Sequence, residues 1–262
     1  SPSSAPLSGR GPPVRRGGTS LPDPVVDCSG TACVANVSGL YGFALACDDD
    51  APPRFGQPAT SATLPPMPNR IHIAVVDTET TGLYPSSDRI IEIAVKLLAI
   101  TPTGELLQEV ASYQSLHDPG MRIPRDAMAV HGITDAMVRG QRIDAEHVAN
   151  LLAQANLIIA HNSGFDKGFV RQIVPHSDTY LWGCSCRGIP WKRQYPQVWS
   201  ASLPALARYL QLPTGTAHRA LGDVETTVQL LLHRGPTGEA HVAHLLRSKL
   251  GKKVAGLLGP RP

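Results

Sequence analysis

The chain has 262 residues and a formal net charge of +3, from 24 lysine and arginine residues against 21 acidic residues. Charged residues make up only 17% of the chain, which excludes a polybasic protein of the histone type but permits a nucleic-acid partner. The five cysteines have no regular spacing, so we expect reduced thiols and a cytoplasmic location rather than a disulfide framework. No apolar run approaches the ~20 residues of a membrane helix, and no membrane partner is expected.

Residues 1–69 differ in composition from the rest of the chain. They contain twelve of the 24 prolines, together with eight glycines. Such a segment buries too little apolar surface to offset the entropy of ordering it, so we expect it to be disordered. A catalytic-type α/β domain is expected over residues 70–235. Residues 236–262 form an amphipathic basic helix or tail in this prediction, with Lys249, Lys252 and Lys253 as its basic residues.

Three strands are predicted at the start of this domain. Residues 71–76 form a short β-branched run, which is typical of a strand buried on both faces. Residues 89–100 and 106–116 are predicted as the second and third strands. Turn-forming residues at 85–88 and 102–104 separate the three strands, so a close antiparallel meander is expected.

Helices and strands then alternate along the chain. Helices are predicted at residues 144–156, 165–174, 202–210 and 219–233, and strands at 157–160 and near 180–184, the latter inside a long connection over 176–200. This order predicts an α/β fold in which the antiparallel meander is followed by parallel strands and flanked by helices.

Acidic residues follow the first strand. Asp77 and Glu79 are two residues apart, so their side chains point to the same side of an extended chain, and Gly82 permits a sharp turn after them. Two carboxylates at the end of an apolar strand are costly unless a cation is their partner. The alternative is that Asp77 caps a turn while Glu79 is solvated.

Two further acidic residues fall on predicted helices. Asp166 lies in the first turn of the helix after the strand at 157–160, where it could also simply interact with the helix dipole. Asp223 lies in the helix at 219–233, shortly after His218, which could equally be a structural histidine at a helix N-terminus.

The four acidic residues are more informative together than singly, because their carboxylates come from two strand ends and two helices of one domain. Carboxylate oxygens suit Mg²⁺ or Mn²⁺ better than zinc. A cluster of this kind can hold two ions ~3.5–4 Å apart, an arrangement suited to phosphodiester hydrolysis. A neutral histidine beside it is a suitable base for an attacking water.

The three segments around these residues resemble the Exo I, Exo II and Exo III motifs of the DEDDh exonucleases, the DnaQ-like family. The resemblance extends from about Arg70 to His233, and residues 125–134 are similar to the H-G-I-T stretch of such domains. It implies a ribonuclease H-like fold and a metal-dependent 3′–5′ exonuclease that acts on single-stranded 3′ ends, most naturally of DNA. The open alternatives are an epsilon-like proofreading subunit with a DNA polymerase as partner, an RNA-trimming exoribonuclease, and a catalytically inactive binding module.

The resemblance also implies roles for individual residues. Asp77 would bridge two divalent ions, with Glu79, Asp166 and Asp223 as the remaining ligands, and His218 would activate the water. The terminal nucleotide would contact a further set: Thr80, Thr81, Gly82, Leu83 (as a wedge against the terminal base), His131, Asn162 and Phe165.

The segment 182–199 interleaves aromatic and basic residues. Basic side chains bind phosphates and aromatic rings stack on unpaired bases, so Arg187, Lys192 and Arg193 are predicted to bind the nucleic-acid strand. The alternative is that Trp182 and Trp191 only pack the domain.

Overall fold

The computed structural model describes residues 70–258, with side chains through residue 251. The expected disorder of residues 1–69 lies outside the described residues, as do the side chains of Lys252 and Lys253.

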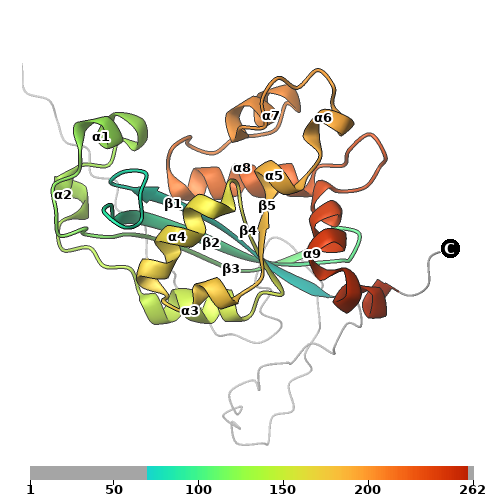
Figure 1. The fold of residues 1–262 in the computed structure, drawn as a ribbon, viewed down its shortest axis with the longest axis horizontal. Helices are drawn as coiled ribbons and strands as arrows, with labels where there is room; N and C mark the ends of the chain where they lie inside the picture. Colours follow the sequence, from blue (N-terminus) through green and yellow to red (C-terminus); the bar gives the residue numbers. More distant parts are fainter. Residues whose placement is uncertain (1–69, 259–262) are drawn as a thin grey trace, which may run out of the picture. The chain divides into compact units, whose positions relative to one another are not determined.

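A five-stranded mixed sheet forms the centre of the described residues, with strand order β3-β2-β1-β4-β5 (Figure 1). Its strands are β1 (Ile71–Thr80), β2 (Ile90–Ile100), β3 (Leu106–Leu116), β4 (Leu157–Ala160) and β5 (Trp182–Cys184). The first three pair antiparallel, whereas β4 pairs parallel with both β1 and β5. The predicted meander followed by parallel strands is therefore confirmed.

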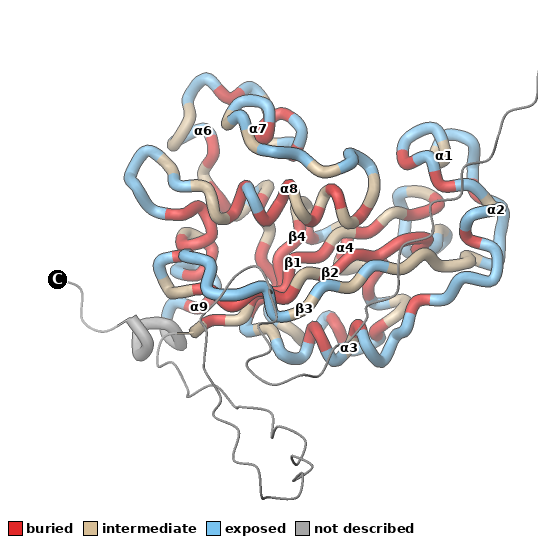
Figure 2. The backbone as a smooth tube through the Cα atoms, turned by 180° about the vertical axis from the view of Figure 1, so that it is seen from behind, coloured by how far each residue is buried: buried red, intermediate tan, exposed pale blue. Residues whose placement is uncertain are grey.

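Helices cover both faces of the sheet (Figures 1 and 2). Their bounds are α1 (Arg125–His131), α2 (Asp135–Val138), α3 (Ala145–Ala153), α4 (Ser163–Ile173), α5 (Ser185–Gly188), α6 (Trp191–Gln194), α7 (Leu203–Tyr209), α8 (Ala220–Leu232) and α9 (His241–Leu258). A 3-10 turn, η1 (Ser177–Thr179), precedes β5.

Two hydrophobic clusters explain why β1 is apolar on both faces. Ala74 and Val76 lie in the cluster formed with α3 and α4, whereas Ile73 and Val75 lie in the cluster formed with α7, α8 and α9. Successive side chains of a strand point to opposite faces, so alternate residues of one run supply both clusters. Burying the strand in this way fixes the position of the acidic residues at its end.

The structure differs from the predicted elements in several places. β1 continues to Thr80, so Asp77 and Glu79 lie within the strand, where they pair in register with Ala94 and Glu92 of β2. The connection 176–200 contains η1, α5 and α6 in addition to β5. The short helices α1 and α2 follow β3, in a region for which no helix was predicted.

The C-terminal helix α9 begins at His241. Val242, Leu245, Leu246 and Leu250 are buried in the same cluster as α8, so this helix contributes to the core on one face of the sheet.

Candidate active site

Three carboxylates meet at one end of the sheet. Asp77 and Glu79 extend from β1, and Asp223 extends from the first turn of α8. One ligand oxygen from each residue lies within 4.8 Å of the other two, and all three side chains are partly buried. Two residues on the same side of β1 and one residue of α8 thus form a compact group of carboxylate oxygens that could hold a metal ion.

Asp166 lies beside this group and is not one of the three mutually close carboxylates. It is buried in α4, and its Oδ1 accepts a hydrogen bond of 3.0 Å from the hydroxyl of Thr78. Thr78 lies between Asp77 and Glu79, so β1 contacts Asp166 directly. The charge of Asp166 is close enough to contribute to the raised pKa of Asp77.

Burial and mutual repulsion raise the pKa values of these acids. Burial is the largest cause for each acid. The pKa of Glu79 is raised to about 8. The pKa of Asp166 is raised to about 7, although a hydrogen bond from Thr78 opposes this rise. The pKa of Asp77 is well above its ordinary value, since four neighbouring acids, the other three of the site and Glu92, add to the effect of burial. The pKa of Asp223 is raised as well. Ionising all four without a cation is therefore unfavourable.

The residues present fit a hard divalent cation. All the grouped side chains offer carboxylate oxygen, the donor that Mg²⁺ and Mn²⁺ prefer, and their separation allows one ion to contact more than one of them. A cation would also remove the repulsion that raises their pKa values.

His218 lies next to the carboxylates in an unusual backbone conformation. Its φ is 57°, in the left-handed region, its side chain is exposed, and its backbone N–H donates to Oδ2 of Asp223 at 3.2 Å. A non-glycine residue in this region is strained by roughly 1–3 kcal/mol and persists where its surroundings hold it. The structure therefore holds the predicted base and the predicted ligand in one turn.

The loop that carries His218 packs closely on α8. A Cβ at Gly222 would collide with the backbone of Thr216, and the N–H of Gly215 donates to the hydroxyl of Thr226 at 3.2 Å. Gly222 thus permits the close approach that presents His218 at the start of the helix.

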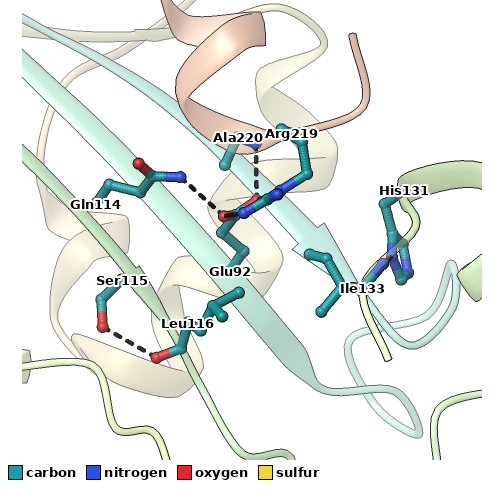
Figure 3. Close-up of polar contacts among 8 residues, drawn as sticks. All are labelled: Glu92, Gln114, Ser115, Leu116, His131, Ile133, Arg219 and Ala220. Atoms are coloured by element: carbon teal, nitrogen blue, oxygen red, sulfur yellow. Dashed lines mark hydrogen bonds and ion pairs between the residues drawn. The ribbon is translucent and has the colours of Figure 1, made fainter. Parts of the chain in front are cut away.

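A buried network beside the site was not predicted. Glu92 of β2 is fully buried, and its carboxylate accepts hydrogen bonds from the guanidinium of Arg219 (2.7 and 3.1 Å), the backbone N–H of Ala220 (2.9 Å) and the amide of Gln114 (2.9 Å) (Figure 3). Burial alone would raise the pKa of Glu92, but these hydrogen bonds outweigh it and lower the pKa. The available signal was a single acid inside the apolar run of β2.

Four of the predicted contact residues lie at the end of β1 and in the loop that follows it: Thr80, Thr81, Gly82 and Leu83. The hydroxyl of Thr80 donates to the carbonyl of Gly82 at 2.6 Å, and the hydroxyl of Thr81 accepts from the N–H of Arg89 at 2.9 Å. Both threonines are buried, so their side chains brace the loop. Leu83 is 71% exposed.

Three other predicted contact residues lie in different settings. Asn162 has φ 85° directly before α4, and the partly buried Phe165 packs against Phe169 with ring centroids 4.9 Å apart. His131 is buried at the end of α1, where its Nδ1 accepts from the N–H of Ile133 at 3.0 Å and burial lowers its pKa. Figure 3 places it beside the Glu92 network.

The tryptophans of segment 182–199 divide into two kinds. Trp182 and Trp191 are buried, and their indole N–H groups donate to the carbonyls of Ser177 and Ser185, both at 2.8 Å. These two residues therefore pack the domain. Trp199, in contrast, is 76% exposed.

The basic residues of the same segment face solvent. Arg187, Lys192 and Arg193 are exposed, and none of them forms an ion pair with another described residue. Their charges remain available to a polyanion.

The mixed sheet with helices on both faces is a ribonuclease H-like exonuclease fold, and the three grouped carboxylates lie at one end of its central strand. The model of the exonuclease family RNase_T matches residues 74–231, and the chain belongs to this family. It carries an exonuclease-type domain, a phosphodiester hydrolase.

Several known proteins are similar to this chain. The PolC-type DNA polymerase III of Thermotoga maritima is 33% identical over 171 residues, which cover 60% of this chain and 11% of that protein. A DNA polymerase III subunit epsilon-like protein of Rhodobacter capsulatus is 32% identical over 207 residues, covering 74% of this chain and 27% of that protein. The chain therefore corresponds to a minor part of these relatives.

A solved structure of E. coli exonuclease I with single-stranded DNA and zinc shares the fold, with a TM-score of 0.51 and 17% identity over 70% of this chain and 42% of that one. Within the described range, no helix is long and apolar enough to cross a membrane.

Proposed function

We propose that this chain is a metal-dependent 3′–5′ exonuclease that removes nucleotides from the 3′ end of single-stranded DNA. The observation that carries the proposal is the group formed by Asp77, Glu79 and Asp223, whose oxygens lie within 4.8 Å of one another in an exonuclease-family fold. Asp166, buried against β1, is proposed as the fourth acid.

Two divalent cations, Mg²⁺ or Mn²⁺, would be held by Asp77, Glu79, Asp166 and Asp223. When bound, such ions orient the phosphodiester and offset the negative charge that develops on its oxygens. His218 accepts the proton of the attacking water in this proposal; its side chain is exposed, and its backbone N–H is bonded to the carboxylate of Asp223. The water oxygen bonds to phosphorus, the bond from phosphorus to the 3′ oxygen of the preceding nucleotide breaks, and that oxygen takes up a proton.

The surroundings of the site support a single-stranded substrate. A cavity of about 450 Å³ opens beside Asp223 and is lined by residues of α7 and the following loop, including Leu203, Arg208 and Leu212. This volume lies within the range of small-ligand sites, so it has room for a nucleotide. The exposed loop residue Leu83 and the exposed Trp199 offer apolar surfaces to unpaired bases.

The test uses matched single-stranded DNA, single-stranded RNA and duplex DNA, labelled at either end, with Mn²⁺, Mg²⁺ or a chelator. We expect 5′-labelled DNA to shorten in single-nucleotide steps and 3′-labelled DNA to release labelled mononucleotide at once, both only with metal. Asp77→Asn is the inactive control. Release of 5′-terminal nucleotides, or equal cleavage with the chelator, would refute the proposal. Preference for RNA would replace DNA by RNA as the substrate.

The names of the relatives support a second proposal, proofreading in partnership with a DNA polymerase. Both relatives described above are named as DNA polymerase III proteins. The test compares excision of a mismatched and a matched 3′ terminus in duplex DNA. Strong preference for the mismatched end supports proofreading, and equal rates argue against it.

A further inference from the structure

A fully buried carboxylate outside the candidate metal ligands ties two parts of the site together. Glu92 has no exposed surface, yet donors from three separate places surround it: the side chain of Arg219, the backbone of Ala220 and the side chain of Gln114 (Figure 3). Removing a carboxylate from water is costly, so a network this complete is retained where its geometry matters.

The position of Glu92 relates it to the ligands on β1. Glu92 is the register partner of Glu79 across the β1–β2 ladder. Its hydrogen bonds reach Arg219 and Ala220, the residue before α8 and the first residue of that helix. The strand that carries two of the grouped carboxylates and the helix that carries the third are thus joined through one side chain.

The same contacts hold His218. Its left-handed backbone lies directly before Arg219, and its N–H is bonded to Asp223 in the first turn of α8. One side of this turn is fixed by Glu92 and the other by Asp223. A shift of the helix start would therefore move the base and a ligand together.

We propose that Glu92 and Arg219 are a positioning pair that sets where His218 and Asp223 lie relative to the β1 carboxylates. This inference rests on the proposed function and adds residues that act through others. The rest of α8 is anchored by apolar side chains such as Val224, Leu230 and Leu231, which are buried in the core. Losing the pair should disturb the end of the helix nearest the site more than the fold as a whole.

The test uses Glu92→Gln and Arg219→Lys, each of which removes part of the paired geometry while keeping a polar group in place. The control is Arg247→Lys, because Arg247 makes a similar bidentate salt bridge with Glu239 (2.8 and 2.8 Å) on an exposed surface. Mn²⁺ affinity is measured by calorimetry without nucleic acid, and the single-turnover cleavage rate is measured at saturating Mn²⁺; the substrate dissociation constant is obtained alongside as a third quantity.

We expect each site variant to lose about 10- to 100-fold in Mn²⁺ affinity, in cleavage rate or in both, as is typical when an outer-shell partner of a metal site is removed. Substrate affinity should stay near that of the wild type, because the predicted phosphate contacts lie elsewhere. Glu92→Gln/Arg219→Lys should be no worse than the poorer single variant, since both changes break one unit. Arg247→Lys should match the wild type.

Wild-type Mn²⁺ affinity and cleavage rate in both site variants would overturn the positioning role, as would an equal loss in Arg247→Lys. If Glu92→Gln does not fold, Arg219→Lys, which retains the positive charge, decides the question by the same two measurements. A wild-type chain that neither binds Mn²⁺ nor cleaves DNA would instead overturn the proposed function, so the two failures are distinguishable.

Discussion

Metal binding at this site is expected to release protons, and the number can be worked out from the structure. A pKa of about 8 for Glu79 and about 7 for Asp166 means that at pH 7 about 0.9 and about 0.5 proton are bound, or about 1.4 together. Divalent ions bind carboxylates in the ionised form, so Mn²⁺ binding at pH 7 should release about 1.4 protons from these two residues.

Calorimetry at pH 7 in two buffers of different ionisation enthalpy, PIPES and Tris, measures the released protons directly. Glu79→Gln is the matched control and should lower the release by about 0.9 proton while weakening binding. Tight Mn²⁺ binding without proton release would refute the reasoning. It would mean that the acids are already ionised in the metal-free protein and that the 4.8 Å group is more open in solution.

The same pKa values fix the sign of a stability effect. The folded pKa of Glu79 is about 8 against an ordinary value of 4.5, so between these values the folded state binds more protons than the unfolded state. Glu79 should therefore destabilise the metal-free protein increasingly as the pH rises from about 4.5 to about 8, and Mn²⁺ should remove this effect. The buried histidines His161 and His241 have pKa values lowered to about 4 and act in the opposite direction, so the melting temperature of the wild type is compared with that of Glu79→Gln at pH 5 and pH 8, with and without Mn²⁺. A metal-free wild type that gains stability relative to Glu79→Gln over this interval would contradict the reasoning.

Three further predictions concern single features of the chain. His218→Ala should lower the single-turnover rate about 10²- to 10⁴-fold with nearly unchanged Mn²⁺ affinity, whereas Asp77→Ala should lower both; a normal rate in His218→Ala would make the histidine structural. Replacing Arg187, Lys192 and Arg193 together by alanine should weaken single-stranded DNA binding at low salt and flatten its salt dependence, and an unchanged slope would contradict their role. A chain that begins at residue 68 should fold and keep its nuclease activity, because the composition of residues 1–69 supports no core; folding with loss of most activity would move the domain boundary.

The sheet could be predicted from the sequence because its strands carry strong local signals. The β-branched run of β1 and the closely spaced turns around β2 identify an antiparallel meander without tertiary information. The short helices α1, α2, α5 and α6 lack such signals, since their four to seven residues span at most two turns. Their formation depends on contacts with the rest of the domain, as the burial of Trp191 at the start of α6 illustrates.

The site was predictable to a different degree for each residue. The two-residue spacing of Asp77 and Glu79 places both on one side of an extended chain, and this local geometry needs no fold. The approach of Asp223 depends on how α8 packs on the sheet, so the residues alone indicated it only as one of four carboxylates in the same domain, and the resemblance to a family added its role as a ligand. Glu92 was visible only as an acid inside an apolar strand, and its role could not be predicted because its partners Gln114 and Arg219 lie 22 and 127 residues away in the chain.

Glu79 and Glu92 are register partners on neighbouring strands, yet their pKa values shift in opposite directions. Arg219, a permanent cation of the chain itself, is bonded to Glu92, and the pKa of Glu92 falls despite its burial. Glu79 has Asp77 and Asp223 as near neighbours instead, and its pKa rises to about 8. Among the described residues, a bonded arginine thus accompanies the carboxylate that positions α8, and none is bonded to the carboxylates of the proposed metal site. The group formed by Asp77, Glu79 and Asp223 therefore requires a cation from solution, and hydrolysis of a phosphodiester would use the same cation.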